Sequence, residues 1–297
     1  MIPKRILLSG ATGFVGSALR RRLTELGAEV VPLTRKALTE PHVEWNPPTK
    51  QLEPAQAAGF DAVVHLAGAN VVEARWTEAR KRVLRESRVD ATRQLCQALI
   101  ESGSPPKSFI AASAIGYYGD RGDELLDDSS SRGQGILPDL VEAWENASAD
   151  LEGAGVRVCR LRLGVVLDPS GALLGKLLPI FRWCLGARLG SGKQWISWVS
   201  LSDVVDGFIF ALEQPLRGTF TLVAPNPVTN AEFTRQLAAA VHRPAIFPAP
   251  AWVLRLVFGQ LAQELMLSST RVVPSGLMSS GFTFQHPELS GFLKSVV

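Results

Sequence analysis

Three glycines near the amino end of the chain have the spacing of a turn that binds a nucleotide diphosphate. The segment "GATGFVG" at residues 10–16 follows an apolar run and carries no charge. The first glycine permits the turn, the second lets backbone N–H groups approach a phosphate, and the third lets strand and helix pack closely. The dipole of the following helix favours an anion at its amino terminus. The predicted cofactor contacts here are Gly10, Thr12, Gly13, Phe14, Val15 and Gly16.

A second group of residues distinguishes the two nicotinamide cofactors. An acidic residue at the end of the second strand would hold the ribose hydroxyl of NAD, whereas a basic one accommodates the 2′-phosphate of NADP. The sequence has Thr34, Arg35 and Lys36 there, and no carboxylate before Glu40. Arginine offers phosphate a planar fork of donors. NADP(H) is therefore the predicted cofactor, and an ordinary solvated basic turn is the alternative.

The elements around the glycine turn alternate between strands and helices. Strands are predicted at 5–10, 28–35, 61–68, 108–114 and 156–167, and helices at 17–26, 77–102 and 137–151. The strands are apolar on both faces, which is typical of a parallel sheet covered by helices on each side. The pattern predicts an α/β fold with a Rossmann-type, doubly wound parallel sheet.

The alternation loosens after Asp168 into connections rich in Gly, Pro and Trp. Such a change is expected where a smaller substrate-binding region follows the carboxyl ends of the strands. We predict a dinucleotide-binding domain at 1–167, to which 199–224 return. The smaller α/β region then comprises 168–198 and 225–297.

Composition excludes several other classes of protein. A net charge of +3 over 297 residues, without a nucleic-acid motif, argues against nucleic-acid binding. Three widely separated cysteines indicate reduced thiols, and four isolated histidines offer no metal site. Charged and amide residues interrupt the apolar stretch at 250–267, so it is too broken to span a membrane. A cytoplasmic protein without a membrane partner is expected.

The motifs "SGATGFVG", "HLAG", "ASAIGYYG", "RLRLGVVL" and "WVSLSDVVDGFIFALE" stand in the order found in extended short-chain dehydrogenases/reductases, which the chain resembles. "RWTEARKRVLRESR", "GSGKQWISW" and "APNPVTNAEF" resemble its sugar-nucleotide-epimerase-like subgroup. The resemblance extends from the first strand almost to the carboxyl end. It implies that Leu66, Ala67 and Gly68 line the cofactor and that Ser113 is the family serine.

The resemblance also implies a Tyr and a Lys four residues apart on the helix after Ser113, together with an upstream Asn. The segment 136–148 contains neither Tyr nor Lys, and Arg88 stands at the Asn position. Tyr117 is the tentative substitute for the family tyrosine, with Arg121 at the lysine spacing. Arg88 is expected to contact the cofactor or a substrate anion, and pairing with Glu86 or Asp90 is the alternative.

The carboxyl-terminal half departs from the nucleotide-sugar enzymes of that family. Their pyrophosphate-binding Arg falls on Ile196 and their His on Ser200, so a nucleotide sugar is disfavoured. Lys193, or Arg182 or Arg188, is a partial replacement. Asp203 is expected to pair with a strand arginine such as Arg162. An aromatic-walled pocket is expected from Trp183, Trp195 and Trp198.

Two functions follow from these observations. The first is an NADP(H)-dependent oxidoreductase or epimerase-like enzyme acting on a small carbonyl or sugar-type substrate, without the usual Tyr–Lys pair. The alternative is an NADP-binding regulatory or scaffold protein that has lost turnover and is linked to cell division. By analogy with extended relatives, a homodimer through the long helices is a further expectation.

Overall fold

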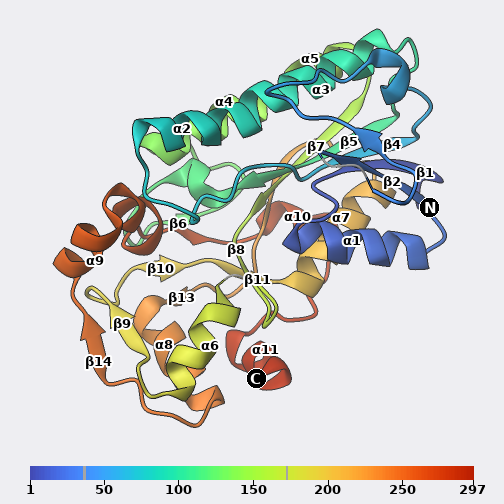
Figure 1. Ribbon diagram of the computed structural model, residues 1–297. Coiled ribbons are helices and arrows are strands. Elements are labelled where there is room, and N and C mark those ends of the chain that lie inside the picture. The colour runs from blue at the N-terminus through green and yellow to red at the C-terminus, as the bar shows by residue number, and fades with distance from the viewer. Residues whose placement is uncertain (36–37, 172) are drawn as a thin grey trace.

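The computed structural model describes residues 1–35, 38–171 and 173–297, and its centre is a seven-stranded parallel sheet (Figure 1). In spatial order the strands are β12 (Gly218–Leu222), β7 (Arg157–Leu163), β5 (Ser108–Ala114), β4 (Ala62–His65), β1 (Arg5–Ser9), β2 (Glu29–Thr34) and β3 (Val43–Glu44). The chain starts at β1, moves to β2, and then returns to place β4 on the other side of β1. The predicted doubly wound α/β sheet is therefore confirmed.

Helices cover both faces of the sheet (Figure 1). One face carries α1 (Phe14–Glu25), α7 (Leu201–Glu213) and α10 (Ser275–Ser279). The other carries α2 (Glu78–Arg85), α3 (Ala91–Glu101), α4 (Ile136–Asn146) and α5 (Ala149–Gly153). Short 3₁₀ turns lie at Pro54–Ala57 and Ile115–Tyr118.

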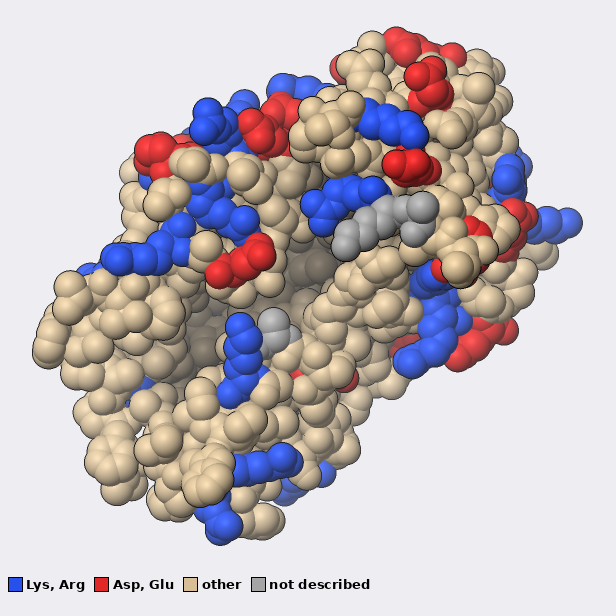
Figure 2. All heavy atoms as spheres, in the orientation of Figure 1, with Lys and Arg blue, Asp and Glu red and all other residues tan. Residues whose placement is uncertain are grey.

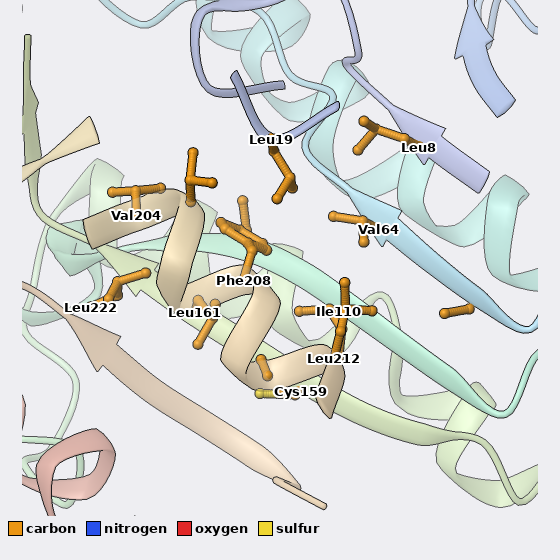
Figure 3. Close-up of a cluster of buried hydrophobic side chains, with 14 of the residues drawn as sticks. Leu8, Leu19, Val64, Ile110, Cys159, Leu161, Val204, Phe208, Leu212 and Leu222 are labelled. Carbon is orange, nitrogen blue, oxygen red and sulfur yellow. The ribbon is translucent and has the colours of Figure 1, made fainter. Parts of the chain in front are cut away.

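The strands are buried because both of their faces pack against helices. Figure 3 shows Leu8, Val64, Ile110 and Leu161 of the sheet facing side chains of α1 and α7. A second buried cluster joins alternate strand residues to α3 on the opposite face. Continuous apolar runs are expected of strands that are covered on both sides.

The helix expected at 77–102 is confirmed as one continuous helical run, made of α2, a π-helical turn (Glu86–Asp90) and α3. Two other predicted elements are broken in the structure. The helix expected at 137–151 is interrupted between α4 and α5. The strand expected at 156–167 divides at Gly164, where a Cβ would lie 2.6 Å from the carbonyl oxygen of Ser197. Its second part, β8 (Val165–Leu167), leaves the sheet and pairs with β11 (Trp198–Ser200).

A smaller lobe lies at the carboxyl side of the sheet and has its own buried cluster around Trp198 and Phe292 (Figure 1). Its helices are α6 (Leu174–Arg182), α8 (Asn230–Ala240), α9 (Ala251–Phe258) and α11 (Leu289–Val296), with a π-helical turn at Ala262–Met266. Its short strands pair as β9 (Ala187–Leu189) with β14 (Phe247–Ala249), and β10 (Trp195–Ile196) with β13 (Val228–Thr229). β15 (Arg271–Val272) pairs with β6 (Leu125–Leu126).

Within the described part of the chain, no helix has both the length and the apolar character needed to cross a membrane. The same residues contain no group of three or more His, Cys, Asp or Glu arranged to hold a metal ion. The two most buried cysteines, Cys96 and Cys159, are free thiols in the core, where burial raises the pKa of each to about 12.

Candidate functional site

The glycine turn lies between β1 and α1, next to the end of β4. Gly10 has a φ of +71°, and a Cβ there would lie 2.9 Å from the carbonyl carbon of Leu66. A Cβ on Gly16 would lie 2.0 Å from the carbonyl oxygen of Gly10. Both positions therefore require glycine, the first for its left-handed backbone and the second for the close approach of helix and turn. β1 and β4 lie at the point where the strand order reverses, where α/β folds bind ligands.

The amino terminus of α1 offers backbone donors at this point. Gly13 caps the helix without a side-chain hydrogen bond, and no acidic residue lies in the first turn. The first N–H groups of a helix have no partner within it and attract anions. A cavity of about 390 Å³ opens beside the turn and is lined in part by Thr12, Phe14 and Ser170. The loop at Ser170 belongs to the small lobe, so both lobes border the turn.

A buried histidine holds the segment after β4 in place. Ser9 Oγ lies 2.7 Å from His65 Nδ1, and His65 Nε2 lies 2.9 Å from Thr92 Oγ1. Ser9 Oγ also accepts the backbone N–H groups of Leu66 and Ala67 at 3.1 and 3.2 Å. Because Ser9 Oγ accepts these two bonds, its own proton is donated to His65 Nδ1. His65 is then the neutral Nε2–H tautomer, and burial lowers its pKa to about 4.

Arg88 places an unpaired cation next to Gly68. It lies in the π-helical turn, a local structure that often occurs at functional sites. Its Cζ lies 5.2 Å from the centre of the Trp144 ring, and a Cβ on Gly68 would lie 3.2 Å from the same atom. Its Nη1 is buried and has no hydrogen-bond partner among the described residues. Burial, followed by the charge of Arg80, lowers the pKa of Arg88 to about 10, so the group stays cationic at neutral pH.

The alternative assignment for Arg88 was an ion pair with a neighbouring carboxylate. Within residues 1–35, 38–171 and 173–297, neither Glu86 nor Asp90 lies within 4.0 Å of its guanidinium, and Asp90 instead lies 3.9 Å from Arg93. A buried cation without a partner is costly, because it has lost its water without gaining an anion. Arg88 thus has no carboxylate partner among the described residues, and its Nη1 is free to donate a hydrogen bond to an anion.

Arg35 follows β2, which pairs with β1 on the side opposite β4. Thr34 ends the strand half-buried and Arg35 follows it, exposed to solvent, while Lys36 lies outside the described residues. Nearby, Arg20 of α1 donates two hydrogen bonds to the carboxylate of Glu40. Figure 2 shows the hollow between the two lobes, with lysine and arginine side chains on its rim.

Ser113 lies at the end of β5 and is engaged by α4. Its Oγ donates a 2.5 Å hydrogen bond to Oε1 of Glu145. The same carboxylate accepts two hydrogen bonds of 2.8 Å from the Nε and Nη2 atoms of Arg162 on β7. The side chains of Glu145 and Arg162 are 10% and 6% exposed, so this ion pair is shielded from water. Burial acts to lower the pKa of Arg162, but its bonds to Glu145 outweigh that effect and raise it.

The two tyrosines lie against the guanidinium of Arg162. The Tyr117 ring centre is 3.4 Å from its Cζ, and Tyr118 OH accepts a 3.0 Å hydrogen bond from its Nη1. Tyr118 is fully buried, and this burial raises its pKa to about 12. Tyr117 is only partly buried. Arg121, which stands at the lysine spacing from Tyr117, instead pairs with Glu124.

The helix beside Ser113 therefore presents a carboxylate instead of a tyrosine–lysine pair. α4 contributes Glu145 to Ser113 and Trp144 to Arg88, so this one helix links the tentative catalytic residues to the nucleotide cleft. Sequence reasoning missed Glu145. The sequence did contain a signal for it. In "RLRL" the side chains of a strand alternate between faces, so Arg160 and Arg162 point to the same layer of helices, and buried arginines there need acidic partners.

Two expectations for the second half of the chain are wrong. Asp203 does not pair with Arg162. It lies in the first turn of α7, behind the N-cap Ser200, and its carboxylate accepts bonds from Ser200 Oγ at 2.7 Å and from the backbone N–H of Gln285 at 2.6 Å. The three tryptophans do not line one pocket either, because Trp198 is fully buried in the small-lobe core while Trp183 is 79% exposed.

Of the residues considered as substitutes for a pyrophosphate-binding arginine, Arg182 and Arg188 lie exposed on the small lobe. Ile196 lies in β10 and Ser200 caps α7 with a bond to Asp203. Neither Ile196 nor Ser200 offers a cation to a diphosphate.

Comparisons with known families and structures agree with this geometry. Residues 6–221 match the model of the NAD dependent epimerase/dehydratase family. Residues 249–296 match a domain of unknown function, DUF1731. The chain is 40% identical over 283 residues to the epimerase family protein Mb2239 of Mycobacterium bovis, covering 95% of this chain and 93% of that protein.

Two solved structures are similar along the whole chain. The human epimerase family protein SDR39U1, isoform 2, crystallised with NADPH, has a TM-score of 0.91 at 33% identity, and the match covers 98% of each chain. A nucleoside-diphosphate sugar epimerase from Corynebacterium glutamicum has a TM-score of 0.83 at 32% identity. The match covers 99% of this chain but only 58% of that one.

Proposed function

Because this chain belongs to the NAD dependent epimerase/dehydratase family, we propose that it binds NADPH in the cleft between β1 and β4. We further propose that it uses NADPH as an oxidoreductase or epimerase-like enzyme on a small carbonyl or sugar-type substrate. The observation that carries the cofactor proposal is the half-buried guanidinium of Arg88 beside Gly68, whose buried Nη1 has no hydrogen-bond partner among the described residues. The NADPH in the human relative's structure adds support.

The proposed cofactor contacts divide among three segments. The pyrophosphate lies on the N–H groups of the glycine turn, and the ribose side lies along Leu66–Gly68. Arg35, together with Lys36, binds the 2′-phosphate. Arg88 supplies a fixed cation to the same ligand from the opposite side of the cleft. These contacts are Gly10, Thr12, Gly13, Phe14, Val15, Gly16, Thr34, Arg35, Lys36, Leu66, Ala67, Gly68 and Arg88.

When bound, the nicotinamide supplies hydride-transfer chemistry, and the protein's part is to orient the substrate and exclude water. Ser113 and Tyr117 are the proposed substrate contacts. The proton of Ser113 Oγ is already donated to Glu145, so only the oxygen lone pairs of Ser113 face outward. A substrate hydroxyl can therefore donate to Ser113, and Glu145 is placed behind it to share that proton.

The substrate is proposed to be smaller than a nucleotide sugar. Ile196 and Ser200 offer no cation where nucleotide-sugar enzymes hold a diphosphate. A compact hydroxyl or carbonyl compound needs only the polar contacts of Ser113 and Tyr117. We retain as proposals the division into a dinucleotide-binding part and a smaller substrate-binding part, a cytoplasmic location, and a homodimer.

The alternative is a regulatory or scaffold protein that binds NADP(H) without turnover. One observation favours it specifically. α4 carries Glu145 against Ser113, and the buried Tyr118 has a pKa raised to about 12, so the usual acid/base pair has no close equivalent there. Cofactor binding is common to both functions, and turnover distinguishes them.

Calorimetric titration with NADPH and with NADH tests the cofactor proposal. Wild type is expected to bind NADPH more tightly. Arg35→Ala should reduce that preference by about 1–3 kcal/mol, the value of a charge-assisted phosphate contact. Arg88→Met should weaken both nucleotides about equally, because Arg88 does not face the 2′-phosphate. Arg217→Ala, an exposed arginine at the opposite end of the sheet, is the matched control.

Each result has a distinct meaning. Equal binding of the two nucleotides by wild type contradicts the role of Arg35. Binding of neither nucleotide makes the glycine turn purely structural. A screen of NADPH oxidation with small carbonyls, and of NADP⁺ reduction with sugars and alcohols, then tests turnover. Ser113→Ala and Tyr117→Phe should abolish turnover while leaving NADPH affinity unchanged, and an inactive wild type that still binds NADPH supports the regulatory alternative.

A further inference from the structure

Exposed apolar side chains gather on the small lobe, over the end of α6, strand β14 and helix α9. The most exposed are Trp183 (79%), Leu185 (64%), Ile246 (75%), Phe247 (57%), Trp252 (68%) and Leu256 (70%). Single exposed apolar residues are ordinary, but a group of this size on adjoining elements marks an interaction surface. These six residues are called the apolar face below.

The segments of the apolar face are held next to one another. β14 pairs with β9, which begins two residues after Leu185, so that Phe247 lies opposite Ala187. Arg243 Nε donates to the carbonyl oxygen of Arg182 at 3.3 Å. This bond joins the end of α6 to the segment that precedes β14. α9 follows β14 directly (Figure 1). Trp252 and Leu256 are four residues apart on α9 and therefore lie on one side of it.

The segments that form the apolar face carry positive charge alone. The sequence has no Asp or Glu from 169 to 202 or from 233 to 263. The exposed cations beside the apolar side chains are Arg182, Arg188, Arg243 and Arg255. Among the described residues none of the four lies within 4.0 Å of a carboxylate. Figure 2 shows the contrast, with basic side chains among uncharged ones over the small lobe and acidic ones gathered over the sheet domain.

The polar side chains present on this surface determine what can cover it. Segments 179–190 and 242–258 contain no Asp, Glu, Asn, Gln, Ser, Thr or Tyr. A protein–protein interface carries about one hydrogen bond per 100–200 Å² and uses acceptors as well as donors. A symmetric contact with a second copy would bring this arginine-ringed surface against itself and juxtapose like charges. Arginine around Trp, Phe and Leu is instead typical of segments that lie on anionic lipid.

We propose that the apolar face docks on the surface of a bilayer containing anionic phospholipid. Trp183, Trp252 and Phe247 enter the headgroup region, and the arginines beside them contact lipid phosphates. No segment crosses the bilayer. This peripheral contact departs from the prediction of no membrane partner, which rested on the absence of a spanning segment.

Flotation of the purified full chain with two kinds of vesicle tests the proposal. The vesicles contain either phosphatidylcholine alone or equimolar phosphatidylcholine and phosphatidylglycerol. Binding is expected on the anionic vesicles and should fall with added salt. Each arginine near the surface contributes about a fivefold gain in partitioning, so Arg182→Gln with Arg255→Gln should weaken binding about thirtyfold.

A matched double variant removes the same charge elsewhere. Lys4→Gln with Arg217→Gln changes two exposed cations at the amino ends of β1 and β12, away from the apolar face. It should bind vesicles like wild type. Because the substituted arginines are exposed and have no carboxylate partner, both double variants are expected to keep the wild-type melting temperature. If both double variants lose vesicle binding equally, net charge alone drives binding, and the proposal of a docking face is refuted.

Tryptophan fluorescence gives an independent readout. Insertion of Trp183 and Trp252 should shift the emission of the protein to shorter wavelength on anionic vesicles, and Trp183→Phe with Trp252→Phe should remove most of that shift. Failure of wild type to float with anionic vesicles would refute the proposal. Light scattering gives a second way to refute it. If wild type is a dimer and the double variant Trp252→Ser with Leu256→Ser is a monomer, the apolar face is a subunit interface and not a membrane-docking surface.

Discussion

The neutral His65 makes the stability of the fold depend on pH in a calculable way. Protonation of Nδ1 would remove the acceptor of the Ser9 hydroxyl and place a charge in the core. The folded-state pKa of about 4 lies below the usual value of 6.5. The unfolded chain therefore takes up a proton at a higher pH than the folded one, and stability is lost as the pH falls from about 6.5 toward 4.

The size of the effect follows from the shift. One pKa unit corresponds to about 1.4 kcal/mol, so a shift of about 2.5 units is worth about 3 kcal/mol once both states are protonated. Between about pH 8 and pH 4.5, most of this should appear as a loss in the free energy of unfolding. Carboxylates that titrate in the same window add their own slope, so a comparison with a variant is needed.

Urea unfolding followed by circular dichroism, repeated across this pH range, measures the slope. His65→Gln keeps a polar side chain between Ser9 and Thr92 but does not titrate. On acidification its free energy of unfolding should therefore fall by about 2–3 kcal/mol less than that of wild type. NADPH affinity in wild type should not change through His65 until the pH approaches about 4, because folded His65 is neutral above that pH and keeps Ser9 in place for the backbone N–H groups of Leu66 and Ala67. Parallel slopes in the two proteins would refute the neutral, buried state of His65.

Two further predictions concern the core. Glu145→Ala leaves its arginine partner buried without an anion and should lower the free energy of unfolding by about 3–5 kcal/mol, measured by urea titration. Full stability in that variant would contradict the shielded ion pair. With burial raising the pKa of Cys96 and Cys159 to about 12, a thiol reagent at mildly alkaline pH should leave both unmodified until the protein unfolds. Cys184 is partly exposed and should react in the native state, and rapid modification of all three would be contrary to expectation.

The sheet and the glycine turn were predictable because their signals are local. An apolar strand, three spaced glycines and a following helix occupy the first 26 residues, and each feature has a steric reason that does not depend on distant residues. The Gly16 contact with Gly10 is an example, since six residues separate the two. The end of β2 is equally local, and Arg35 follows it exposed to solvent.

The breaks within elements were not predictable in the same way. The sequence pattern predicts one long apolar strand that runs through Gly164. In the structure the chain leaves the sheet at this residue, where the backbone of Ser197 approaches from another segment. The π-helical turn at Glu86–Asp90 lies within an ordinary amphipathic pattern. At Gly164 the deciding contact is made by a residue far away in the sequence, which periodicity does not register.

Buried polar partners were the hardest to assign. Asp203 and Arg162 are both buried and oppositely charged, so pairing them was reasonable, but each found a different partner. The segment at Gln285 and His286 supplies Asp203 with backbone donors, and α4 supplies Arg162 with the carboxylate of Glu145. Many pairings satisfy the rule that buried charges need partners, and only the three-dimensional arrangement selects one.

The contrast between Arg162 and Arg88 shows what the fold leaves for a ligand. Both are largely buried cations beside α4, yet Arg162 receives a bidentate carboxylate and Arg88 only the face of Trp144. A cation–π contact does not satisfy the N–H donors of a guanidinium, and Nη1 of Arg88 is left without an acceptor among the described residues. Glu86 and Asp90 are each two residues from Arg88 on the helix, a spacing at which side chains do not face each other, so neither neutralises it. The unpartnered Nη1 of Arg88, at the edge of a glycine cradle, is the strongest physical reason to expect an anion there.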